Sequence, residues 1–210
     1  MQMVSYSEFV PELKLALGDI PDDIAENYIR EAVIAFCERS QVLVRKVEID
    51  VQAGVGDYPI IPEGCEQIIS LQRVCVGSHC ITDRKILLSF EPCETGCTVH
   101  GHSVWFVPPN TLNLRPIPTQ DKAKAIIAFV AVSPSRDSCE CDRIIYDRYH
   151  ETVINGALAR LYLAKTTPWH DRQLAEYHRT LFGAGVSAAG MDRLTGGVRG
   201  PFAMRARRII

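Results

Sequence analysis

The spacing of apolar residues changes twice along this 210-residue chain, and these changes constrain the fold more than any other feature. Up to residue 42, and again from residue 142, apolar residues recur every three or four positions, as in a helix packed on one face. Between them, in Val47-Glu48-Ile49-Asp50-Val51, apolar and charged residues alternate, which is typical of a half-buried strand. The pattern predicts an α+β protein.

We therefore expect a helical bundle formed by the N- and C-terminal helices, a small inserted antiparallel β-sheet or sandwich, and an extended C-terminal tail. The expected boundaries are residues 1–42 and 135–190 for the bundle, 43–134 for the β-rich insert and 191–210 for the flexible docking tail. A first helix is expected over residues 7–17, capped by Ser7. A second helix follows Pro21, with one apolar face formed by Ala25, Ile29, Ala32, Val33, Phe36 and Cys37.

Two more helices are expected after the β-rich insert. The first covers about residues 142–165, and its small residues let another helix approach closely: Gly156, Ala157 and Ala159. The second begins within TTPWHDRQLAEYHR, residues 166–179, with Thr167 as its cap and Pro168 in its first turn. Trp169 is expected to take part in helix packing. The expected buried face of this helix contains Leu174, Tyr177, Leu181 and Phe182.

The same stretch holds His170, Asp171 and His178, which together resemble parts of an active site. Eight helical residues place the two histidines about 12 Å apart along the axis, too far to share a metal ion. Asp171 favours the positive end of the helix dipole. We interpret the stretch as the start of a helix, without a chemical role.

The composition and the first residues argue against a membrane-spanning protein and against a secreted one. The chain is 47% hydrophobic and 23% charged, as in globular proteins, and has no apolar run long enough to span a bilayer. The first residues show no secretory signal, so we expect a reducing cytoplasm. In that compartment the eight cysteines are interpreted mostly as small buried apolar residues, without a disulfide framework.

One segment, CETGCTVHGH at residues 93–102, contains the residue types that bind zinc: Cys93, Cys97, His100 and His102. Their spacing matches no common zinc finger, and a polar turn with buried thiols is the favoured interpretation. A small zinc-binding enzyme or binding module is the alternative. The sequence shows no G-x-S-x-G, phosphate-binding loop or H-E-x-x-H motif, so we expect no catalytic residues and no cofactor.

Charge is uneven along the chain, although the net charge is only −2. Residues 191–210 carry five arginines against Asp192, which leaves −6 on the other 190 residues. Several glycines keep this segment from folding alone, and its spaced anchors are typical of a segment that folds onto a partner; a frayed end is the alternative. The anchor residues are Leu194, Arg199, Phe202, Met204, Arg205, Arg207, Arg208 and Ile209.

Four segments together resemble the head-to-tail adaptors of short-tailed bacteriophages, over about residues 5–190. They are PDDIAENYIREAVIAFCERS, GDYPIIPEGCEQIISLQRV, LNLRPIP and YHETVINGALARLYLAKTTPWHDRQLAEYHRTLFGAGVSAA. The resemblance implies a structural virion protein without enzymatic activity. It would be assembled in the host cytoplasm, placed in the neck, and have no contact with a membrane.

The resemblance also implies partners. Twelve copies would form a ring beneath the portal protein, extend the channel through which double-stranded DNA passes without specific binding, and carry the tail or nozzle protein. Carried over to this chain, residues 191–210 would dock on the portal and the β-rich insert would face the next tail component. The segment from Cys93 to His102 has no counterpart in the family pattern.

Overall fold

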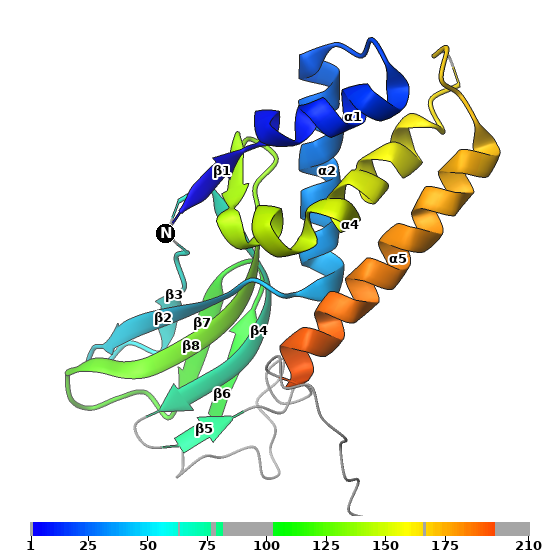
Figure 1. The fold of residues 1–210 in the computed structure, drawn as a ribbon. Helices are drawn as coiled ribbons and strands as arrows, with labels where there is room; N and C mark the ends of the chain where they lie inside the picture. The colour runs from blue at the N-terminus through cyan, green and yellow to red at the C-terminus, as the bar shows by residue number, and fades with distance from the viewer. Residues whose placement is uncertain (1, 63, 77–78, 82–102, 166, 196–210) are drawn as a thin grey trace, which may run out of the picture.

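The computed structural model describes residues 2–62, 64–76, 79–81, 103–165 and 167–195, and it confirms the α+β class (Figure 1). The described helices are η1 (Tyr6–Phe9, a 3-10 helix), α1 (Val10–Leu17), α2 (Asp22–Ser40), α4 (Arg143–Leu161) and α5 (Arg172–Thr195). The described strands are β1 (Met3–Ser5), β2 (Val44–Val51), β3 (Asp57–Pro59), β4 (Glu66–Val76), β5 (His79–Ile81), β6 (Ser103–Val107), β7 (Thr111–Arg115), β8 (Lys122–Pro134) and β9 (Glu140–Asp142).

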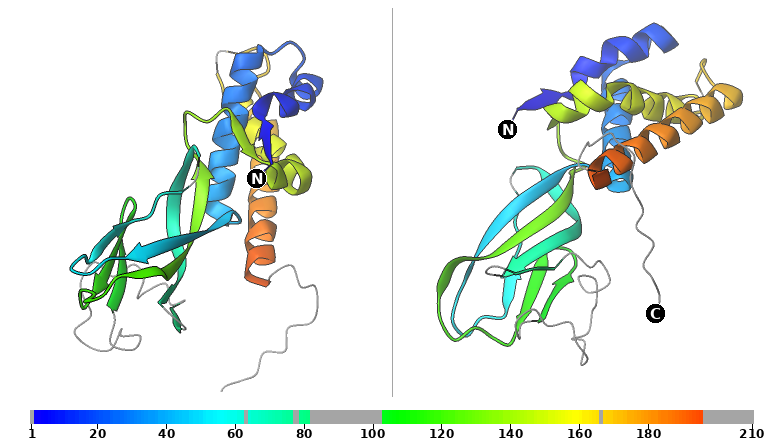
Figure 2. Two further views of the ribbon diagram at one scale, coloured as in Figure 1. Left: turned by 90° about the vertical axis from the view of Figure 1, so that its left-hand side faces the viewer. Right: turned by 60° about the horizontal axis from the view of Figure 1, so that its bottom comes forward.

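The strands form small antiparallel sheets. A four-stranded sheet has the order β2-β8-β4-β5, and a three-stranded sheet with the order β3-β7-β6 forms a second layer beside it (Figure 2). Alternate residues of each sheet are buried in a common core, among them Phe106, Leu112, Ile126 and Val130. The alternating pattern of β2 holds as expected, with Ile49 and Val51 buried.

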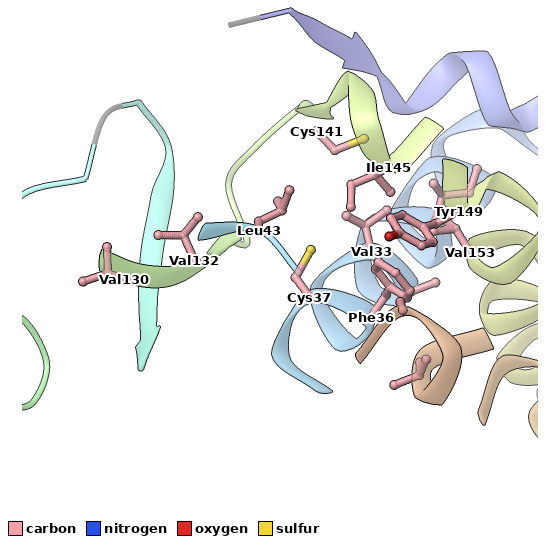
Figure 3. Packing of buried hydrophobic residues seen from close by; sticks show 14 of the residues in the cluster. Val33, Phe36, Cys37, Leu43, Val130, Val132, Cys141, Ile145, Tyr149 and Val153 are labelled. Carbon is pink, nitrogen blue, oxygen red and sulfur yellow. The ribbon is translucent and has the colours of Figure 1, made fainter. Parts of the chain in front are cut away.

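Helix α2 is the centre of the helical layer. All six residues of its expected apolar face are fully buried. The helix ends where Gln41 takes a left-handed conformation with φ of 52°, and the Gln41 amide donates a 2.8 Å hydrogen bond to the Cys37 carbonyl. Leu43 and Val132 then fill the space between the sheet and the helices (Figure 3). The helices and the sheets therefore share one continuous core.

A partly buried ion-pair network joins the β layer to the helices. Arg45 on β2 donates to Glu66 on β4 at 2.6 Å and to Asp142 before α4 at 2.8 Å. Burial alone would lower the pKa of Arg45, but the hydrogen bonds and charges of Glu66 and Asp142 outweigh burial and raise it. The other carboxylate oxygen of Asp142 caps α4 by accepting from the Ile144 amide at 3.0 Å. One residue thus fixes both the ion pair and the helix start.

The N-terminus differs from the expectation in one detail. The cap is Ser5, whose hydroxyl accepts from the Ser7 amide and the Ser7 hydroxyl, so the expected cap at Ser7 is wrong. The cause is β1, which pairs with β9 and ends at Ser5, so that the chain turns directly into η1 before α1. Phe9 and Leu13 are fully buried, as expected.

The free cysteines of the described chain divide into two groups. Cys37 and Cys141 are buried, and burial raises the pKa of both thiols, that of Cys141 to about 12. Cys65 and Cys139 are exposed, so the interpretation as buried apolar residues is wrong for them. Cys75 is disulfide-bonded, which the expectation of a reducing compartment did not include.

Candidate functional site

Helices α4 and α5 pack closely because Gly156 has no side chain. A Cβ atom at Gly156 would lie 2.8 Å from two ring carbons of Phe182 and 3.2 Å from the Ala32 Cβ. Gly185 plays the same part on α5, since its Cβ would lie 2.3 Å from the Thr152 hydroxyl. With Ala157 and Ala159 also buried, the expected small-residue contact between helices is present.

The start of α5 is built by Asp171. Its carboxylate accepts from the amides of Gln173 at 2.8 Å and Leu174 at 3.0 Å, so Asp171 is the cap and the expected cap at Thr167 is wrong. The Thr167 hydroxyl instead donates to the Ala164 carbonyl at 2.7 Å, in the turn that ends α4. Trp169, in the same turn, is partly buried against the core. The stretch therefore forms the turn after α4 and the start of α5, as predicted, and its lack of a chemical role stays a prediction.

His178 is a packing residue. Its Nδ1 lies 2.7 Å from the side-chain oxygen of Asn155, whose amide nitrogen donates to the Glu151 carbonyl, so His178 Nδ1 carries the proton. The imidazole stacks on the Tyr162 ring, and burial lowers the pKa of His178. His178 is partly buried, and its hydrogen bond to Asn155 joins α5 to α4.

The buried face of α5 differs from the expected one. Ala175, Phe182, Val186 and Ala189 are buried. Of the residues expected inside, Leu174 is 41% exposed, Tyr177 59% and Leu181 37%. The physical reason is that α5 carries two apolar stripes one residue apart, and the close approach at Gly156 and Gly185 turns the Phe182 stripe inward.

The C-terminal end of α5 extends into the expected tail. Residues 191–195 are helical, so the boundary at 191 is wrong by these residues. The reason is a tether: Arg193 donates to the Gln72 side-chain oxygen on β4. Leu194 is 70% exposed, and the other expected docking residues, from Arg199 to Ile209, lie outside the described residues.

The charged groups of the described chain show no arrangement for metal chemistry. No group of three or more His, Cys, Asp or Glu residues within the described ranges can hold a metal ion, and the zinc candidates at 93–102 lie outside those ranges. A cavity of about 470 Å³ lies beside the sheet–helix junction. Its lining includes Glu66, Asp137, Glu140 and Asp142, and two of these carboxylates, Glu66 and Asp142, are paired with Arg45. Across the described residues, no helix has the length and apolar character needed to cross a membrane.

The helical layer carries exposed large apolar side chains on its outer side, among them Leu15 on α1 and Tyr177 on α5. The chain belongs to the SU10 adaptor protein family, whose model matches residues 4–205. This membership confirms the resemblance to phage head-to-tail adaptors and a structural role in the virion. Comparison with curated proteins gives no match.

Proposed function

We propose that this protein forms the ring between the portal and the tail of a phage, with twelve copies around an extended DNA channel. The observation that carries the proposal is the adaptor-family match over residues 4–205. The structural role of the family also supports a protein without enzymatic activity. Assembly would take place in the host cytoplasm, before the neck becomes part of the virion.

The C-terminal segment docks on the portal. The Arg193–Gln72 hydrogen bond fixes the end of α5 against β4, close in sequence to the first residue of the segment 196–210. That segment combines arginines with apolar residues such as Phe202 and Met204. Each buried apolar side chain stabilises docking by roughly 1.5–3 kcal/mol before ordering costs, and repetition around a ring adds avidity. The β-sandwich then faces the tail or nozzle protein.

The channel must let DNA slide without binding it. Binding to DNA comes mainly from neutralising phosphates with Lys and Arg, and the first 190 residues carry −6 instead. The basic C-terminal segment binds the portal and does not line the channel. This division of charge supports passage of the genome during packaging and ejection.

The test is assembly onto DNA-filled heads that carry the portal but lack this protein. We expect the purified chain to cosediment with these heads, and to stop DNA leakage once tail proteins are added. Heads without the portal are the matched control and should not bind. Equal sedimentation with both kinds of head, or with neither, would contradict the proposal.

A further inference from the structure

The outer side of α5 carries an apolar stripe whose side chains stay largely exposed among the described residues. Tyr177 is 59% exposed and Met191 58% exposed. The stripe repeats with alternating spacings of three and four residues, as in the seam of a coiled coil. Its members, all exposed, are Leu174, Tyr177, Leu181, Ala184, Ala188 and Met191.

Gly183 lies beside this stripe, and no close contact with another described residue requires a glycine there. Gly156 and Gly185 are required because a Cβ would strike Phe182 or Thr152, but a Cβ on Gly183 would meet no atom within 4 Å. Glycine inside a helix costs about 1 kcal/mol relative to alanine. The open space at Gly183 therefore points to a close approach by atoms from another chain.

The stripe continues into a groove at the C-terminal end of α5. The groove has a volume of about 450 Å³ and lies between α5 and the end of α2. Met191 and Leu194 supply apolar surface, Gly190 leaves it open, and Arg39 and Arg193 give it positive charge. The groove fits an apolar side chain that has acidic neighbours.

An apolar side chain with acidic neighbours is exposed on helix α1 of this chain. Leu15 on α1 is 89% exposed, the highest exposure among the large apolar residues described. Four acidic residues lie within seven positions of it: Glu8, Glu12, Asp19 and Asp22. The Glu12 carboxylate lies 3.2 Å from His150 Nε2. Lys14 is paired with Asp22. Helix α1 lies on the opposite side of α4 from α5 (Figure 2), so Leu15 cannot fill the groove of its own subunit.

We infer that the outer face of α5 binds helix α1 of a second copy of this chain, with Leu15 in the groove beside Gly190. The contact joins an apolar, basic surface to an apolar, acidic one. It uses two different faces of each subunit, which is the condition for a closed ring. The inference rests on the ring proposed above and names the faces that form it.

Disulfide cross-linking within assembled particles tests the contact. Phage carrying Leu15→Cys and Gly190→Cys in one chain are oxidised, and their neck proteins are separated without reductant. We expect a ladder of cross-linked subunits, with the Leu15–Gly190 linkage identified by peptide mass spectrometry. A Cβ at Gly190 lies 3.9 Å from the nearest atom, the Ser40 carbonyl oxygen, so the substitution fits the fold.

The matched control pairs Leu15→Cys with Ile117→Cys, since Ile117 is 47% exposed on the β layer and should form no ladder. A second pair of variants, Leu15→Asp and Ile117→Asp, changes two exposed positions: we expect only the first to lose ring assembly. If necks contain the protein but the Leu15–Gly190 linkage is absent, the inference is wrong and the adaptor role stands. If the wild-type chain is absent from virions, the adaptor role fails, and the same cross-link in concentrated purified protein decides the inference.

Discussion

Arg193, in the last turn of α5, donates a 2.5 Å hydrogen bond to the side-chain oxygen of Gln72 on β4. Gln72 in turn donates to the Gln41 side chain at 3.0 Å and to the Ser70 hydroxyl at 2.6 Å. Gln41 is the residue that ends α2. The end of α5, the end of α2 and the sheet are therefore joined at one point, from which residues 196–210 continue.

Replacing Arg193 should loosen this point. We expect Arg193→Ala to lower the free energy of unfolding by about 1 kcal/mol, since it removes a charged hydrogen bond that is only partly buried. Hydrogen exchange should become faster in the last turns of α5. Arg179→Ala, at an exposed position paired with Glu176, is the control and should leave exchange in those turns unchanged. Equal exchange in both variants would contradict the tether.

Two glycines on facing helices should respond in opposite ways. Gly156→Ala places a Cβ 2.8 Å from the Phe182 ring and should lower the free energy of unfolding by about 1–3 kcal/mol. Gly183→Ala meets no atom and should raise it by about 0.5–1 kcal/mol through helix propensity. Urea unfolding of the isolated subunit measures both. A stabilised Gly156→Ala would show that α4 and α5 do not meet as described.

His178 should make stability depend on pH. Burial lowers the pKa of His178 below its usual 6.5, so the unfolded chain binds the proton more readily than the folded chain. The stabilising contribution is complete above pH 6.5 and is lost as the pH falls toward the lowered pKa. His178→Ala should cost about 1–3 kcal/mol by leaving the Asn155 oxygen without a donor, and should reduce this pH dependence. Melting curves at pH 7.5 and 5.5 measure both effects, and an unchanged pH dependence would be inconsistent with a partly buried imidazole that is neutral in the folded chain.

Much of the fold could be predicted from the period of the apolar pattern. The six residues expected on the apolar face of α2 are all buried, because they form one stripe along the helix; Ile34 is buried as well, outside the expected set. On α5 the same reasoning chose Leu174 and Tyr177, since two stripes lie side by side and periodicity cannot tell which one faces the core. The choice depends on Gly156, which lies on another helix.

The interaction surfaces were harder to predict. Long-range partners such as Arg193 with Gln72, or Arg45 with Asp142, leave no local signal in the sequence. The exposure of Leu15 was equally hard to predict, because a leucine within a short helix is usually expected to face the core. The structure shows that it faces outward. Asp171 could have been recognised as a cap from its position before a regular helical pattern.

Removal of residues 196–210 tests the docking segment separately from the fold. We expect the truncated chain to keep its melting temperature, because α5 and the Arg193 tether stay intact, yet to lose binding to DNA-filled heads. Binding of the intact chain should weaken as salt rises, since arginines take part. Substituting the segment's arginines with glutamine is the matched control for charge. Normal occupancy of heads by the truncated chain would place docking in the helical body.

The most direct test of the adaptor role is an electron-microscopy reconstruction of the neck of the phage that encodes this chain. We predict a ring of twelve copies between the portal and the tail, with the C-terminal segments on the portal and the β-sandwiches toward the tail. Density for a different protein at that position, or this chain placed elsewhere in the virion, would contradict the account.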